Sequence, residues 1–401
     1  MYGGAVLEER AYRVVKSSDI NEMNKKIHRH RRRILLLTAL VVILLLGIVT
    51  GVYIYIQTRS YKEYEVLSSV ERKDSDRTFF TTFNENVIKY NKDGASCVDA
   101  DNRIIWNQTY EMQSPMVDTC ESYAVVADKK GEKVYIMDRQ GPCGEIRTTM
   151  PIQRVQVANQ GEVAVLMEEN GTGSIHVYDR EGKFLAEGEL HTENTGYPVD
   201  ISISNDGKKL AASLLDVNEG TVKTTVVFYN FGSAGQNEID NIVCQYSYAD
   251  MIFPRIEFLT NNVMAAFGSG QTVIFEGEQK PQVKAQISLE QEIQSIFYNE
   301  AYVGFVFNNE NKKEPYRLQV FDLNGKEILA KDFDIKYQEI EFLANDEVCV
   351  RADSECIIYT LHGIEKFHGN FKKNILKIMS GGGIRDYIFW AEGETQKIRL
   401  K

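Results

Sequence analysis

The sequence predicts an all-β protein, an eight-bladed β-propeller preceded by one transmembrane α-helix. Two observations lead to this fold class. One stretch of 23 residues carries no charged side chain, and most of the remaining 401-residue chain repeats a unit of four short strands. The hydrophobic fraction of 43% and the charged fraction of 26% are ordinary for a folded protein, which excludes wholesale disorder.

The uncharged stretch runs from Ile34 to Ile56. At about 1.5 Å per residue, a helix of this length reaches about 34 Å, enough to cross the roughly 30 Å hydrocarbon core of a bilayer. Tyr53 and Tyr55 lie near its far end, as expected where aromatic side chains meet the headgroups. A buried core helix is the alternative, but such helices rarely exceed about 10–14 uninterrupted apolar residues.

The charges that flank this stretch predict its orientation. After it, only Arg59 and Lys62 precede the acidic residues Glu63 and Glu65. Before it lies a basic cluster of six residues: Lys25, Lys26, Arg29, Arg31, Arg32 and Arg33. The excess of Lys and Arg predicts a cytoplasmic N-terminus, a single-pass cell-membrane protein and an extracytoplasmic C-terminal domain. A cleaved signal peptide fits less well, because the apolar stretch exceeds the usual length of about 7–15 residues and no small-x-small site follows it.

Net charge divides at the same place. Residues 1–33 carry 9 basic and 4 acidic side chains, net +5, whereas residues 57–401 carry 37 basic and 53 acidic side chains, net −16. The basic cluster would attract anionic lipid, by about 1 kcal/mol for each side chain near the surface. The acidic exterior repels phosphate and the short cytoplasmic segment holds no binding fold, so we expect no nucleic-acid partner.

The clearest repeat unit runs from Ile152 to Leu190 and reads IQRVQVA, EVAVLME, SIHVYD and FLAEGEL between turns. The pattern begins again near Val199, Ile293 and Glu339. The turn between the third and fourth strands recurs at steps of 39 to 50 residues, at Asp99, Asp138, Asp179, Tyr229, Glu276, Asp322 and Leu361. Four strands in such a period are typical of a propeller blade. A β-sandwich is the main rival, but its domains of about 100 residues do not repeat this unit.

The two ends of the repeat array predict how the ring closes. The segments at Ile375, Arg385 and Thr395 supply three strands, and YKEYEVLSS from Tyr61 would supply the fourth. Such a shared blade removes a free sheet edge and brings the count to eight. Seven blades is the alternative, because the unit around Val87 has a poorly marked opening strand. The resulting organisation is a basic tail (1–33), a transmembrane helix (34–56), a juxtamembrane segment with the closing strand (57–78) and the propeller (79–401).

The first unit, YNKDGASCVDADNRIIWNQTY over residues 90–110, resembles the quinoprotein-type propeller repeat and, more distantly, WD40-like repeats. The resemblance implies that Trp106 docks against the next blade; the later units lack this Trp and depart from the quinoprotein pattern. With the basic cluster and the single span, the repeats resemble an uncharacterised family. Its members are single-span, membrane-anchored, propeller-like proteins of unknown function from Gram-positive anaerobes. That resemblance implies fold and topology but no activity.

Motifs that carry chemistry are weak in this sequence. There is no GxxxxGK[ST] phosphate loop, and the glycines at 268–270 and 381–383 are expected in turns. Ser233 lacks the spacing of a nucleophile elbow. His176, His191, His362 and His368 show no metal-ligand spacing, and the sequence predicts no convergent carboxylates or His at the propeller axis. Asp99, Asp101 and Asn102 offer oxygens for Ca²⁺, although the same residues form a tight turn unaided.

Cys349 and Cys356 flank a short predicted hairpin, EVCVRADSECIIY. With a loop of two or four residues they would face each other on neighbouring strands, and a disulfide is permitted outside the cytoplasm. Cross-strand disulfides are often strained, so two separate, half-buried thiols are the favoured interpretation and a disulfide is the alternative.

These observations favour a non-enzymatic binding or scaffold module of the cell envelope, without a cofactor. Its partners would be the lipid bilayer and another envelope protein, a peptide or a glycan, because short loops on a rigid ring give adaptable binding surfaces. The alternative is a propeller enzyme of the quinoprotein or metal-dependent type.

Overall fold

The computed structural model describes residues 17–75, 77–190, 196–217 and 220–401, and its contacts divide the chain into two units, Met1–Arg59 and Ser60–Lys401. The first 16 residues of the predicted tail and His191 lie outside the described residues.

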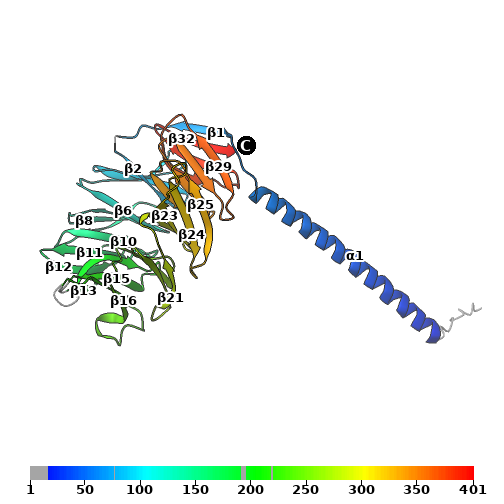
Figure 1. Ribbon diagram of the computed structural model, residues 1–401, viewed down its shortest axis with the longest axis horizontal. Helices are drawn as coiled ribbons and strands as arrows, with labels where there is room; N and C mark the ends of the chain where they lie inside the picture. Colours follow the sequence, from blue (N-terminus) through cyan, green and yellow to red (C-terminus); the bar gives the residue numbers. More distant parts are fainter. Residues whose placement is uncertain (1–16, 76, 191–195, 218–219) are drawn as a thin grey trace, which may run out of the picture. The chain divides into compact units, whose positions relative to one another are not determined.

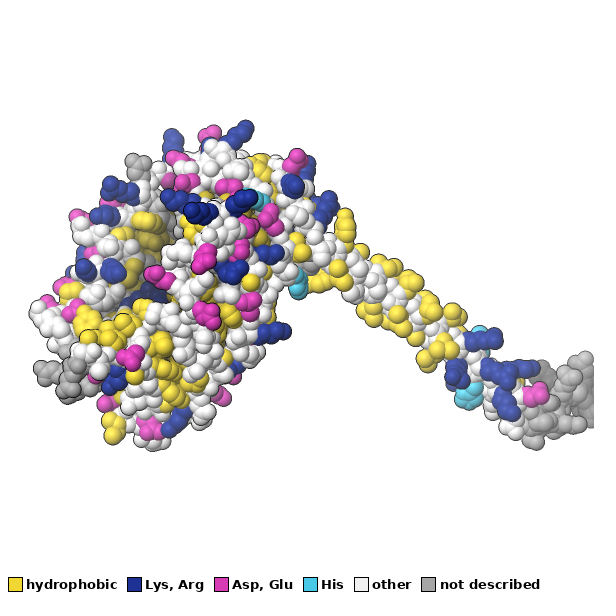
Figure 2. Space-filling view, viewed as in Figure 1, with side chains coloured by type: hydrophobic (Ala, Val, Ile, Leu, Met, Phe, Trp, Pro, Cys, Tyr) yellow, Lys and Arg dark blue, Asp and Glu magenta, His cyan; other side chains and the backbone are white. Residues whose placement is uncertain are grey.

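Helix α1 (Ser17–Gln57) belongs to the first unit. In the part of the chain that the structure describes, it is the one helix long and apolar enough to cross a membrane, over Asn21–Tyr55, although a signal sequence has the same character. Figure 2 shows a Lys and Arg cluster near one end of the helix and hydrophobic side chains along the rest. The Thr38 and Thr50 hydroxyls donate to backbone carbonyls one turn earlier, at 2.9 and 2.7 Å. The apolar stretch therefore satisfies its hydroxyl groups internally, as hydrocarbon requires.

The helix begins well before the predicted span boundary at Ile34. Lys25 to Arg33 continue the same helix without a break, because Lys and Arg are good helix formers. Ile34 therefore lies inside α1, whereas Ile56 is its penultimate residue.

The second unit contains eight antiparallel sheets of four strands each, arranged as the blades of a propeller (Figure 1). We number the blades in chain order and place the shared sheet last. The strands of blades 1 to 4 are β2 (Phe79–Phe83), β3 (Asn86–Tyr90), β4 (Gly94–Val98), β5 (Ile104–Thr109); β6 (Pro115–Cys120), β7 (Tyr123–Asp128), β8 (Lys133–Asp138), β9 (Pro142–Arg147); β10 (Ile152–Val157), β11 (Val163–Glu169), β12 (Thr172–Tyr178), β13 (Phe184–Leu190); β14 (Tyr197–Ile203), β15 (Lys209–Asp216), β16 (Lys223–Asn230) and β17 (Ile242–Ala249). A short 3-10 helix, η1 (Ile239–Asn241), precedes β17.

Blades 5 to 7 follow the same order along the chain, and blade 8 combines both ends of the second unit. Their strands are β18 (Arg255–Phe258), β19 (Val263–Phe267), β20 (Gln271–Glu276), β21 (Gln282–Ser288); β22 (Ile293–Tyr298), β23 (Tyr302–Asn308), β24 (Tyr316–Asp322), β25 (Glu327–Phe333); β26 (Glu339–Phe342), β27 (Val348–Arg351), β28 (Glu355–Tyr359), β29 (Glu365–Asn370); and β30 (Ile375–Ser380), β31 (Asp386–Ala391), β32 (Glu394–Leu400) with β1 (Tyr64–Glu71).

Blade 8 confirms the predicted ring closure. β1 pairs antiparallel with β32, from Tyr64 opposite Leu400 to Glu71 opposite Glu394 (Figure 1). The poorly marked opening strand of blade 1 is β2, which pairs with β3. The count is therefore eight rather than seven.

The third-to-fourth strand turns lie where the sequence predicts them. Four Asp residues each accept hydrogen bonds at Oδ1 from two backbone N–H groups of their own turn, at 2.7–3.0 Å: Asp99, Asp138, Asp179 and Asp322. This side-chain capping explains why Asp recurs at the position. Gly182 closes one such turn at φ +85°, and an added Cβ would overlap the carbonyl oxygen of Glu145 on the neighbouring blade.

Hydrophobic clusters fill every interface between neighbouring blades. Middle strands such as β19 are buried along their whole length, because a neighbouring blade covers each face. The cluster between blades 8 and 1 is the smallest, with four buried side chains against at least ten in each of the others: Val87, Val98, Met379 and Trp390. The interface between blades 8 and 1 is thus the least apolar of the ring.

Candidate functional site

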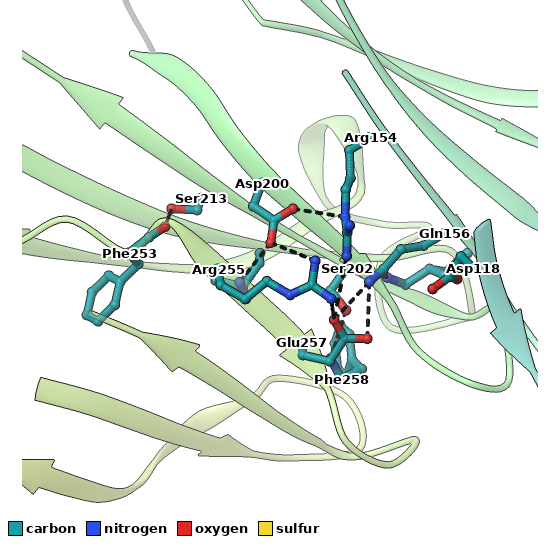
Figure 3. Close-up of polar contacts among 12 residues, drawn as sticks. Asp118, Arg154, Gln156, Asp200, Ser202, Ser213, Phe253, Arg255, Glu257 and Phe258 are labelled. Carbon is teal, nitrogen blue, oxygen red and sulfur yellow. Dashed lines mark hydrogen bonds and ion pairs between the residues drawn. The ribbon is translucent and has the colours of Figure 1, made fainter. Parts of the chain in front are cut away.

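The first strand of each blade lies at the propeller axis, because first strands of neighbouring blades contact one another, as β14 contacts β10 and β18. Polar residues occur at alternate positions on several of these strands. Three such pairs are Arg154 and Gln156 on β10, Asp200 and Ser202 on β14, and Arg255 and Glu257 on β18. Figure 3 shows that these side chains, with Asp118 of β6, converge from four different blades. The sequence interpretation that no carboxylates converge at the axis is therefore wrong.

These polar side chains cap the neighbouring first strands. Asp118 accepts a hydrogen bond from the Val157 backbone N–H at 2.9 Å, and Gln156 accepts one from Ile203 at 2.9 Å. Asp200 and Ser202 accept from two N–H groups of β18 at 2.9 and 2.7 Å. First strands are sheet edges with unpaired N–H groups, and burying such groups without a partner is costly. The capping therefore joins blades 2 to 5 around the axis.

Glu257 is the centre of the charged network in Figure 3. It accepts hydrogen bonds from Arg255 at 2.6 Å, from the Tyr298 hydroxyl at 3.0 Å and from Gln156 at 3.0 and 3.1 Å. Arg154 lies 3.3 Å from the Asp200 carboxylate. The two guanidinium groups thus pair with Asp200 and Glu257, while the buried Arg154 Nε has no hydrogen-bond partner among the described residues.

Burial shifts the pKa values of the three axial carboxyls upward, since the charged form loses solvation. Burial and the nearby Glu257 raise the pKa of Asp118 to about 7. Burial also raises the pKa of Asp200. It raises the pKa of Glu257 as well, although the Arg255 guanidinium opposes part of that shift. Asp118 therefore changes charge near neutral pH.

A second charged group lies on blades 7 and 8. The buried Lys377 ammonium of β30 donates to Glu341 at 2.7 Å and to Glu339 at 3.3 Å, and Arg351 donates to Glu339 at 2.9 Å. Burial raises the pKa of Glu341, whereas the pKa of Glu339 is lowered despite burial, by Lys377 and Arg351. Glu341 is therefore the less compensated carboxylate of the pair.

A cavity of about 890 Å³ opens beside Glu341 at one end of the axial channel. Its walls come from the turns between first and second strands of blades 1, 6, 7 and 8. We call it the mouth cavity. Its apolar lining includes Phe342, Leu343, Ile378, Met379 and Ile388, and its acidic lining is Glu85, Glu300, Glu341 and Asp346. None of its lining residues is Lys or Arg.

The opposite end of the same blades holds a smaller and more polar cavity of about 540 Å³. It is lined by the starts of β2, β26 and β30 and includes Arg351 and Glu339, which pair with each other. The two ends of the channel thus differ, since Arg351 lines the smaller cavity and no Lys or Arg lines the mouth cavity.

The site residues predicted from the sequence are not among those that line this cavity. The six basic residues of the cluster from Lys25 to Arg33 are exposed on α1. Trp106 on β5 is buried in the cluster that joins blades 1 and 2. Asp99 caps its own turn, and Asp101 pairs with Lys397 at 2.6 Å. Within the described residues, no group of three His, Cys, Asp or Glu side chains could hold a metal ion.

Cys349 and Cys356 are both buried with free thiols, and the predicted opposition is wrong. Cys349 pairs with Ile358 and Cys356 with Arg351. The turn centres on Asp353 and Ser354, one residue later than an opposed pair requires, so the two positions differ by two residues across the strands. Burial raises the pKa of both thiols, which keeps them protonated and unreactive.

Sequence reasoning missed the axial network and the mouth cavity. The signal available for the network was the alternation of polar residues on first strands, such as Arg154 with Gln156 and Glu339 with Glu341, where a propeller exposes one strand face to the channel. No comparable signal marks the cavity, because its walls come from four turns far apart in the chain.

Comparison with known proteins agrees with this architecture. A family model described as "Family of unknown function (DUF5711)" matches residues 57–400. No curated protein matches the sequence. Among solved structures, BamB from Moraxella catarrhalis has a TM-score of 0.51 at 12% identity, covering 84% of this chain and 100% of that chain. The C-terminal WD40 domain of Sif2 has a TM-score of 0.54 at 12% identity, covering 86% and 100%. Saccharomyces cerevisiae Sqt1 has a TM-score of 0.53 at 13% identity, covering 86% and 99%. At such low identity these neighbours are similar in fold alone.

Proposed function

The chain belongs to the DUF5711 family of unknown function, and from its geometry we propose a membrane-anchored, non-enzymatic binding module of the cell envelope. In this proposal α1 crosses the bilayer with its N-terminus in the cytoplasm, and the propeller lies outside. The basic cluster from Lys25 to Arg33 fixes that orientation and contacts anionic lipid. The propeller then presents a rigid surface to another envelope component.

The observation that carries the proposal is the contrast between the channel and its mouth. The axial carboxylates are occupied by strand capping and by Arg154, Arg255 and Lys377, which favours a structural role for them. The mouth cavity, at about 890 Å³, lies within the roughly 300–1,000 Å³ typical of ligand sites. A site with apolar walls and a few polar groups suits recognition better than bond making.

Site-specific photocrosslinking of the full chain in its own membranes tests this proposal. A photoreactive amino acid no larger than leucine, with a diazirine side chain, replaces Ala344, an exposed residue that lines the mouth cavity. The control position is Lys312, an exposed residue in the turn between β23 and β24, on the opposite face of the ring. We expect one discrete crosslinked product from position 344 and none from position 312. Equal crosslinking at both positions, or none at either, would contradict the proposal.

The enzyme alternative is tested on the same purified protein. A chromophore bound in stoichiometric amount, or one equivalent of tightly held metal, would favour the quinoprotein or metal-dependent reading over a binding module. Absorbance spectra and elemental analysis of the full chain, purified in detergent, provide the measurement.

A further inference from the structure

The turns between the first and second strands form a ring around one end of the axial channel. All eight of these turns are described, and together they hold seven acidic residues but two basic ones. The basic residues are Lys208 and Arg385; the acidic residues are Glu85, Glu121, Glu162, Asp206, Glu300, Asp346 and Glu347. Charge at this end of the channel is therefore strongly negative.

Internal partners neutralise only part of this charge. Lys208 lies 3.9 Å from Asp206, and Glu347 is buried against Lys366 and the Tyr387 hydroxyl. Neither Glu85 nor Glu300 has an ion-pair partner among the described residues, and both are exposed. Among the described residues, Glu85 and Glu300 at the rim of the mouth cavity thus remain without a paired cation, as do Glu121 and Glu162 elsewhere in the ring of turns.

The inside of the cavity adds a fourth carboxylate, after Glu85, Glu300 and Asp346, and an apolar wall. Glu341 lies at the cavity wall and shares the Lys377 ammonium with Glu339, which also accepts from Arg351. Phe342, Ile378 and Met379 supply apolar surface next to it. Phe342 also packs against the Phe297 ring at a centroid distance of 4.9 Å. This contact fixes the aromatic side chain within the wall.

We propose that the mouth cavity binds an extended cationic segment of another protein, in which a Lys or Arg side chain is flanked by apolar residues. This inference rests on the proposed function and names the chemistry of its partner. The cationic head would lie among Glu85, Glu300 and Asp346, and the apolar neighbours would cover Ile378 and Met379. Charge complementarity selects this occupant, because an anionic ligand would meet only carboxylates. A neutral glycan would find one aromatic ring, which is already packed.

Fluorescence anisotropy of the full chain in detergent micelles provides the test. The probes are three labelled peptides that differ only at two positions, Ala-Leu-Lys-Leu-Lys-Ala and its Glu and Ser counterparts. We expect the Lys peptide to bind at least tenfold more tightly than either counterpart. Raising the salt concentration should weaken that binding.

Variants assign the binding to the mouth cavity. Replacing three rim carboxylates (Glu85→Gln, Glu300→Gln, Asp346→Asn) should weaken the Lys peptide about tenfold, since exposed charge pairs contribute modestly and add. The matched control removes three exposed carboxylates elsewhere, by Glu169→Gln, Glu278→Gln and Glu310→Gln. Ala344→Trp should block the cavity without changing charge. The position-346 variant keeps a residue that tolerates its φ of +61°.

Two outcomes would overturn the inference. The first is equal binding of the Lys, Glu and Ser peptides; the second is an equal loss in the rim and control variants. If position 344 still crosslinks a partner in membranes while the peptides show no charge preference, the cationic inference fails and the binding proposal stands. If position 344 crosslinks nothing, both fail.

Discussion

Arg72 connects blade 8 to blade 1 at the interface with the smallest hydrophobic cluster. Its buried guanidinium donates to the Thr395 hydroxyl at 2.7 Å, to the Ala391 carbonyl at 2.8 Å and to the Glu394 carbonyl at 3.0 Å. It also pairs with Asp74 at 2.9 Å. Its carbon Cζ lies 4.9 Å from the Trp390 ring centroid and 5.2 Å from that of Phe80. One side chain thus links blade 8 to blade 1, where the hydrophobic cluster is smallest.

Arg72→Ala should destabilise the propeller by about 3–5 kcal/mol, the usual cost of breaking a buried charged pair. The loss combines buried acceptors left unpaired, at about 1–3 kcal/mol each before relaxation, with a lost cation–π contact of about 1–2 kcal/mol. Arg72→Lys keeps the charge but not the planar fork, so we expect it to lose about half as much.

The assay is denaturant unfolding of the full chain in detergent micelles, followed by tryptophan fluorescence. The chain has two Trp residues, and a Trp106→Phe background leaves Trp390, which lies at the closing interface, as the reporter. The matched control is Arg399→Ala, which removes a partly exposed pair with Asp386 within blade 8 and should cost less than about 1 kcal/mol. If Arg72→Ala and Arg399→Ala agree within about 0.5 kcal/mol, the closure argument is wrong.

Three further predictions concern the channel, the membrane and the thiols. The native pKa of Asp118 is about 7, above its unfolded value of about 4. The contribution of Asp118 to stability therefore falls as pH rises from about 4 to about 7 and levels off above that range. The free energy of unfolding of Asp118→Asn, relative to that of wild type, should therefore increase by about 2 kcal/mol from pH 5 to pH 8, as measured by urea unfolding. Parallel pH profiles of the two proteins would contradict this. Replacing the six basic residues from Lys25 to Arg33 with Gln should reduce the activity of alkaline phosphatase fused after residue 401, by at least several-fold relative to wild type, whereas Lys312→Gln with Lys313→Gln should not. Cys349 and Cys356 should react with a maleimide only after denaturation, without prior reductant; a requirement for reductant would show a disulfide.

The blades were predictable from the sequence because each blade repeats a local strand and turn pattern. An Asp that caps its own turn, as Asp138 and Asp179 do, needs no distant partner, so its spacing gives the period directly. The closing strand was predictable for a related reason. The C-terminal end of the repeats has three strands of a four-stranded blade, and the single N-terminal strand is the one left to complete it.

The site was not predictable in the same way. Asp118 and Val157 are 39 residues apart, and Gln156 and Glu257 are 101 apart, so their contacts depend on the curvature of the whole ring. The Cys349 register failed for a smaller reason, because moving a turn by one residue moves the cross-strand partner by two. Both failures concern geometry that local patterning does not encode.

The pairing of β1 with β32 in blade 8 is delayed during biosynthesis, because β1 is synthesised long before β32. Ser69 of β1 and its contact Glu394 are 325 residues apart, which at about 5–20 residues per second corresponds to about 15–65 s of elongation. Throughout that interval β1 is an unpaired strand, vulnerable to pairing with the wrong chain. Glu65 and Glu71, near the two ends of the strand, place charges along its unpaired edge and disfavour such pairing. The seven other blades can form in order as they emerge, so the last event in the maturation of this protein is the meeting of its first and last strands.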